Sequence, residues 1–196
     1  MNSTRLTRSF RTMTPLFAAA FLLTACDDDP ATPPEDNEQE LITQVTVTLT
    51  PVGGGAALTS SITDPDGLGA QPPQAATATL ALAAGVTYNG TVEFLDASDP
   101  NDVEDITEEV EEEADEHRIF YIVTGVTGVT VPDASLDQDG NGAPVGLTYQ
   151  VVADAAAAGT GTLRVVLSHY DDEPKGDGSE QSDETDADVS FPMTVN

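Results

Sequence analysis

LITQVTVTLT, residues 41–50, decides the class of fold. Its apolar residues alternate with polar ones, so an extended chain would bury one face and expose the other. The buried face is expected to carry Leu41, Val45, Val47 and Leu49. This stretch therefore predicts a half-buried β-strand at the start of the folded part of the chain.

Further stretches have the composition of short strands and are separated by clusters of Gly, Pro, Asp and Asn. In one of them, residues 86–95, the side chains of Tyr88, Val92 and Phe94 share a face. A domain of about eight or nine short strands predicts an all-β, immunoglobulin-like antiparallel sandwich. The expected strands after the first are 56–63, 75–82, 86–95, 118–124, 126–131, 145–153, 162–170 and 187–195.

One stretch departs from the strand pattern: DVEDITEEVEEEADEH, residues 102–117. Its apolar residues recur at helical spacing and no Gly or Pro interrupts it, which predicts one short acidic helix. Asp105 is placed to cap the start of this helix, with Glu108 in the position of a capping box. Glu111–Glu113 crowd like charges, so salt or bound cations would stabilise the segment.

The first 26 residues have the form of a lipoprotein signal. Three arginines precede the apolar run Pro15–Leu23, which is too short to cross a hydrocarbon core of ~30 Å as a helix. Leu23-Thr24-Ala25-Cys26 follows as a lipobox, which predicts cleavage between Ala25 and Cys26 and a lipid on Cys26. Cys26 is the one cysteine of the chain, so it has no partner for an intramolecular disulfide.

The sequence thus divides into a signal peptide at 1–25, an acidic, Pro-containing tether at 26–40 and a β domain at 41–196. The protein is expected in the cell envelope, attached to a membrane through Cys26. Asp27 resembles an inner-membrane retention signal, whereas an acidic run after the cysteine resembles a surface-export signal. We expect the outer membrane, with the periplasmic and the surface-exposed face both left open.

Acidic residues dominate the chain, with 35 Asp and Glu against 6 Lys and Arg. Three of the arginines lie in the signal, so the remainder carries 3 − 35 = −32 charges. Such a charge repels phosphate backbones and attracts cations and basic partners, which excludes nucleic-acid binding. It also suits a surface that keeps a protein soluble in strong salt.

DQDGNG, residues 137–142, matches the first half of an EF-hand calcium loop, with oxygens from Asp137, Asp139 and Asn141. The twelfth position is Thr148 and not the bidentate Glu, so two oxygens are missing. DPDGLG, residues 64–69, is a weaker copy. Calcium is therefore the one cofactor considered, and the alternative is that both loops are turns stabilised by Asp side chains.

His117 and His169 are the two histidines of the chain, and both stand among acids. On a helix, Glu113 and His117 would lie on one face at a spacing that suits two ligands of one transition metal. His169 opens the cluster HYDDE, residues 169–173, at the end of a strand. If the fold brings the two clusters together they form a metal site; the alternative is two solvated surface histidines.

The chain has no nucleophile elbow, metalloprotease helix motif or phosphate-binding loop. Carboxylates are so abundant that pairs of them do not indicate glycosidase chemistry. The sequence therefore predicts a protein that is not an enzyme and has no catalytic residues.

LTAC, the acidic tether, ITEEVEEEADEH (residues 106–117) and DQDGNG together resemble a family of short, largely uncharacterised bacterial lipoproteins. The resemblance implies a diacylglycerol and an N-acyl chain on Cys26. Some relatives carry the label of a type 1 periplasmic-binding fold, but this chain lacks the alternating helices and the length of that fold. By analogy, the resemblance implies an accessory to outer-membrane nutrient transporters of the TonB-dependent kind.

Two functions follow from these features. The first is a membrane-anchored, non-enzymatic binding or transport-accessory module, with an outer-membrane transporter or another envelope protein as partner. The alternative is a lipoprotein that binds calcium or a transition metal through the residues named above.

Overall fold

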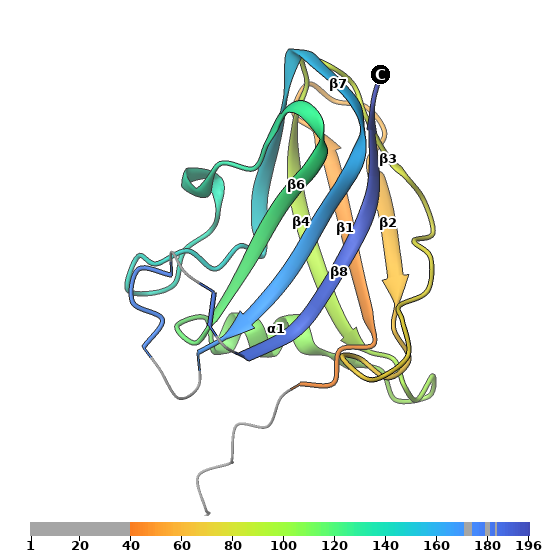
Figure 1. Cartoon of the computed structure of the whole chain (residues 1–196). Coiled ribbons are helices and arrows are strands. Elements are labelled where there is room, and N and C mark those ends of the chain that lie inside the picture. The colour runs from red at the N-terminus through yellow and green to blue at the C-terminus, as the bar shows by residue number, and fades with distance from the viewer. Residues whose placement is uncertain (1–39, 171–173, 179–180, 183) are drawn as a thin grey trace, which may run out of the picture. The chain divides into compact units, whose positions relative to one another are not determined.

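The computed structural model describes residues 40–170, 174–178, 181–182 and 184–196 (Figure 1). The predicted signal peptide, the lipidation site at Cys26 and the tether up to residue 39 lie outside these residues. Within the described part, no helix is long and apolar enough to cross a membrane. In chain order the elements are β1 (Gln44–Pro51), β2 (Leu58–Thr63), β3 (Leu80–Leu82), β4 (Thr87–Asp96), β5 (Glu104–Asp105), α1 (Ile106–Glu112), β6 (His117–Thr130), the 3-10 helix η1 (Asp133–Ser135), β7 (Thr148–His169) and β8 (Glu184–Val195).

The strands form one sheet, in the order β2-β1-β4-β7-β8-β3, with β5 paired to β4 and β6 paired to β7. All pairings are antiparallel except that of β3 with β8. The sheet curls until its outer strands nearly meet (Figure 1). Ser61 of β2 exchanges two 2.9 Å hydrogen bonds with Thr77, in the segment that leads into β3. The β-rich class is therefore confirmed as a nearly closed barrel, whereas the immunoglobulin-like sandwich is not confirmed.

The alternating stretch at the start of the domain behaves as expected, with one exception. Val45, Val47 and Leu49 of β1 point into the core and are at most 2% exposed. The assignment of Leu41 to this face is wrong, because β1 begins only at Gln44 and Leu41 is 45% exposed. Ile42 is buried in its place. The apolar face predicted for residues 86–95 is confirmed in β4, where Tyr88, Val92 and Phe94 are buried.

Two pairs of expected strands are each one long strand. β6 continues through the expected gap between 124 and 126, and β7 runs without a break from Thr148 to His169. The pairing of β6 with β7 shifts its register near Gly125 and Gly128, which have positive φ. These glycines therefore form bulges within a strand, where the sequence pattern indicated turns.

The predicted acidic helix exists but is shorter than expected. The carboxylate of Asp105 accepts a 3.1 Å hydrogen bond from the Thr107 N–H and caps the start of α1, while Ile106 and Val110 face the core. The helix ends at Glu112, so the expectation that Glu113 and His117 share a helical face is wrong. His117 instead begins β6, because strand pairing with β7 takes over at that residue.

β6 and β7 approach each other closely at a pair of glycines. A Cβ added to Gly161 would collide with the backbone carbonyl of Thr124 and lie 2.9 Å from Gly125 Cα. These contacts are with backbone atoms, which cannot rotate away as the end of a side chain can. The absence of a side chain at Gly161 is therefore a condition for the pairing of the two strands.

The variant Gly161→Ala is expected to lower the free energy of unfolding by about 3 kcal/mol, because the β6 backbone must shift to admit the methyl group. Urea denaturation measures this change. Gly140→Ala is the matched control, since a Cβ there meets nothing within 4 Å. Equal stability of the two variants would contradict the close approach.

Candidate metal centre

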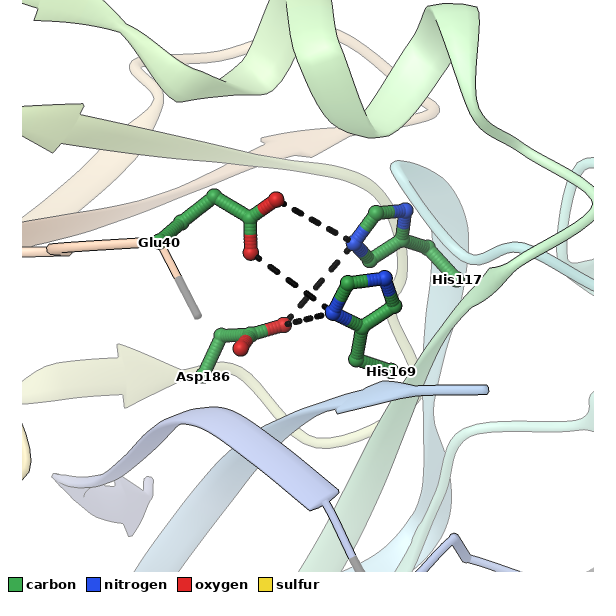
Figure 2. Close-up of side chains that lie close together, drawn as sticks. All are labelled: Glu40, His117, His169 and Asp186. Atoms are coloured by element: carbon green, nitrogen blue, oxygen red, sulfur yellow. Dashed lines mark ion pairs between the residues drawn. The ribbon is translucent and has the colours of Figure 1, made fainter. Parts of the chain in front are cut away.

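Three strand ends and the segment before β1 bring four ionisable side chains together (Figure 2). His117 is the first residue of β6 and His169 the last of β7, and the two lie directly opposite each other in the β6–β7 pairing. Their rings stack with centroids 4.4 Å apart. Asp186 comes from β8, and Glu40 from the chain just before β1.

A β-bulge turns Asp186 toward the histidines. Leu167 pairs with Ala187, whereas the next residue of β7, Ser168, pairs with Thr185, so Asp186 has no residue opposite it. The extra residue breaks the alternation of β8, and Asp186 and Ala187 are both buried although they are neighbours. A bulge that redirects one side chain is a common device at functional sites.

The ligand atoms of the four side chains converge on one small volume. Asp186 Oδ2 lies 3.8 Å from His117 Nε2 and 3.7 Å from His169 Nδ1. Glu40 faces the same two nitrogens, with Oε1 4.0 Å from His117 Nε2 and Oε2 3.9 Å from His169 Nδ1. One ligand atom from each of the four residues lies within 4.8 Å of all the others. Each of these pairs is too far apart for a direct hydrogen bond.

The cluster is buried, yet several of its polar atoms make no hydrogen bond. The side chains of His117, His169 and Asp186 are at most 3% exposed, and that of Glu40 is 9% exposed. Glu40 Oε2, His117 Nε2 and Asp186 Oδ2 are buried without a hydrogen bond. Buried polar atoms are nearly always satisfied in proteins, so three such atoms in one cluster require an explanation.

The inner nitrogen of His117 faces the carboxylates of the cluster, and its outer nitrogen faces a backbone carbonyl. His117 Nδ1 lies 3.2 Å from the Glu113 carbonyl oxygen, to which it can donate an N–H, so Nε2 is the ring atom that a metal would take as its ligand. His169 Nε2 lies 4.0 Å from Glu116 Oε2 on the side away from Asp186. Metal-binding histidines typically donate their second N–H to a carbonyl or carboxylate, as His117 can to the Glu113 carbonyl.

The electrostatics of the cluster favour a cation. Burial, followed by the charge of Glu40, raises the pKa of Asp186 to about 7. Burial alone would raise the pKa of Glu40, but the interactions with His117, a backbone hydrogen bond and the proximity of His169 together lower it. Burial likewise opposes the charged form of His117, but Glu40 and Asp186 raise its pKa. One divalent cation bound among the four side chains would neutralise the two carboxylates once Asp186 has lost its proton.

Two imidazole nitrogens and two carboxylate oxygens form a ligand set that suits Zn²⁺ and related first-row metals. Ligands of a tetrahedral zinc ion are separated by about 3.3 Å, given metal–ligand bonds of about 2.0–2.1 Å. The N–O distances of 3.7–4.0 Å in the cluster exceed this by a few tenths of an ångström. Small side-chain rotations would bring the four atoms to bonding distance.

Part of this centre was predicted from the sequence. The structure brings His117 and His169 together, and Glu113 contributes its carbonyl to His117. The Glu113 carboxylate forms a second, more exposed group with Glu116 and His169. The acids 171–173, expected to accompany His169, lie outside the described residues. Sequence reasoning missed Glu40 and Asp186, since neither stands at a metal-ligand spacing from a histidine.

The loop that resembles a calcium site uses its carboxylates differently. Asp137 Oδ1 accepts hydrogen bonds from the N–H groups of Gly146 and Thr148. Asp139 Oδ1 accepts two more, from Asn141 and Ala143. Asp139 Oδ2 lies 3.1 Å from Lys175 Nζ, in an ion pair whose side chains are at most 3% exposed.

In this loop Asn141 therefore donates a backbone N–H, and the carboxylates that would bind calcium stabilise turns instead. Lys175 supplies the positive charge for Asp139, whose pKa is lowered although burial opposes ionisation. The contacts within residues 137–148 thus correspond to the turn interpretation.

Comparison with known proteins adds no identification, since no family model, curated protein or solved structure matches this chain.

Proposed function

We propose that this protein is a non-enzymatic, metal-binding lipoprotein of the cell envelope. Its β domain holds one transition-metal ion, of the Zn²⁺ kind, among Glu40, His117, His169 and Asp186. The observation that carries the proposal is that Glu40 Oε2, His117 Nε2 and Asp186 Oδ2 are buried without hydrogen bonds, in a cluster whose ligand atoms all lie within 4.8 Å of one another. A divalent cation satisfies all of them at once.

The site supports metal binding rather than catalysis. Catalytic zinc sites have three protein ligands and keep a fourth position open for water or substrate, whereas structural sites are closed by four. Here four protein ligands are available, and each of their side chains is at most 9% exposed. The ion is therefore held or carried, and it joins β6, β7 and β8 to the segment before β1.

The wider role follows from the sequence. A lipid on Cys26 attaches the domain to a membrane, for which we favour the outer membrane, and residues 26–39 separate it from the lipid. Within that setting the protein serves as an accessory to an outer-membrane transporter, and the metal is either its cargo or the element that stabilises its binding domain. The same site would serve either role of the metal, as cargo or as a stabilising ion.

Direct titration tests the proposal. The protein is purified in detergent, stripped with a chelator and titrated with Zn²⁺ at pH 8 in about 0.5 M NaCl, which screens the exposed carboxylates. We expect one tight site per chain in the unmodified protein and none in His117→Ala or His169→Ala. Asp102→Asn, which removes one exposed carboxylate, is the matched control and should bind like the unmodified protein.

Circular dichroism shows whether each variant is folded. Should His117→Ala lose its fold, His117→Gln retains the volume of the side chain but offers a much weaker ligand. Zinc affinity that is equal in the folded histidine variants and in the unmodified protein would overturn the proposal, because exposed acids would then account for the binding.

A further inference from the structure

A second group of unsatisfied carboxylate oxygens lies in the connection that follows β2. The segment is DPDGLG, residues 64–69, and its backbone is well anchored. The Asp64 N–H donates a 2.8 Å hydrogen bond to the Thr43 carbonyl, and the Asp64 carbonyl accepts one of 3.1 Å from Gly67 N–H. Gly67 has a φ of 58°, which lets the chain turn back on itself.

The two aspartates of this turn each bury an oxygen without a partner. Asp64 Oδ1 and Asp66 Oδ1 are inaccessible to solvent and make no hydrogen bond. Asp64 as a whole is 9% exposed. The other oxygen of Asp66 accepts a 3.1 Å hydrogen bond from the Gln71 N–H, which fixes the orientation of that carboxylate. A buried acceptor normally has a partner, and here two occur within three residues.

No basic side chain in the described part of the chain neutralises this pair. Arg118, Arg164 and Lys175 are the Lys and Arg residues of that part. Each is engaged with another carboxylate, at distances of 3.2, 2.6 and 3.1 Å to Asp133, Asp188 and Asp139 respectively. Burial, and then the proximity of Asp66, raises the pKa of the Asp64 carboxyl. Ionising both carboxylates is therefore unfavourable unless a cation lies beside them, and the described Lys and Arg residues are paired elsewhere.

We propose that the Asp64–Gly69 turn binds Ca²⁺ through Asp64 Oδ1 and Asp66 Oδ1. Calcium takes six to eight oxygen ligands in flexible geometry, and carboxylates are its preferred charged ligands in proteins. The cation supplies the missing partner of both oxygens and the missing positive charge in one step. Backbone carbonyls and water complete the shell.

The comparison between the two Asp-rich turns strengthens the assignment. Residues 137–142 match a calcium loop better in sequence, but backbone N–H groups and Lys175 occupy their carboxylates. Residues 64–69 match less well, yet they retain two buried oxygens with no partner. With only two carboxylates, affinity in the range of about 0.1–1 mM is expected, as in extracellular calcium modules.

Thermal melting of the purified protein in detergent tests the assignment. The melting temperature is compared in CaCl₂ and in NaCl of equal ionic strength, so that general screening of the acidic surface is matched. At ten times the Kd, we expect Ca²⁺ to raise Tm by about 4 °C. Asp64→Asn and Asp66→Asn should each lose this shift, and the exposed Asp102→Asn should keep it.

The melting temperature of each variant without calcium shows whether the variant is folded. Because Asp64→Asn removes one of two repelling buried charges, this variant should melt at or above the Tm of the unmodified protein without calcium. His117→Ala should still respond to Ca²⁺, which separates this site from the zinc centre. An unmodified protein that does not respond, or a shift that persists in both turn variants, would overturn the assignment.

Discussion

Saturating Zn²⁺ is expected to raise the free energy of unfolding by about 4 kcal/mol at pH 8, when free metal is a thousand times its Kd. The ligands come from the segment before β1 and from three different strands, so the unfolded chain does not present them together. Metal binding is then linked to folding, and its free energy adds to the stability of the folded state.

Urea denaturation with Zn²⁺ and with a chelator measures this difference. The same pair of curves for His169→Ala should coincide, because one of the two nitrogen ligands is lost. Mg²⁺ at the same concentration is the control for charge screening, since it prefers six oxygen ligands and should stabilise little. A zinc effect of equal size in the histidine variant would contradict a specific centre.

Replacing Asp186 by Asn is expected to stabilise the metal-free protein at pH 8, although it destroys the metal centre. The pKa of Asp186 rises from 3.8 to about 7 on folding, because of burial and of the charge of Glu40. An acid whose pKa is raised in the folded state stabilises it below the unfolded pKa, and this stability is lost as pH rises to the folded pKa. One pKa unit is worth about 1.4 kcal/mol, so the loss amounts to about 4 kcal/mol above pH 7.

The amide introduced by Asp186→Asn does not titrate, so the stability difference between the variant and the unmodified protein depends on pH through Asp186 alone. The stability difference between Asp186→Asn and the unmodified protein, both with chelator, should grow from about pH 4 to pH 7 and stay constant above. Chemical denaturation at intervals of one pH unit measures it. Asp102→Asn is the control and should show no such rise. A flat difference would mean that Asp186 is not held in a charge-disfavouring environment.

Much of the fold could be predicted because it depends on local patterns. The alternation in β1 and β4 was sufficient to identify half-buried strands, and Asp105 marked the start of α1. The curling of the sheet could not be predicted, because it depends on contacts such as those of Ser61 with Thr77, which no periodicity records. Glycines that form bulges in β6 have the same sequence signal as glycines in turns.

The ligands of the proposed metal centre could likewise be predicted only in part. The two histidines attracted attention by their residue type, and the pairing of β6 with β7 brought them face to face. Asp186 is one acid among 35 in the chain, and only the bulge in β8 distinguishes it. Glu40 is the last residue of the predicted tether, and nothing in the sequence distinguishes it from the other acids there. Residue type was thus informative for rare residues and uninformative for common ones.

The position of Glu40 has a mechanical consequence. If Cys26 carries the proposed lipid, a pull on the chain would enter the domain near Glu40 and pass into β1, which is paired with β2 on one side and β4 on the other. An ion bound by Glu40 and by side chains of β6, β7 and β8 would distribute that load over these three strands as well as β1. The metal would then reduce the force that β1 alone must bear where the predicted tether meets the β domain.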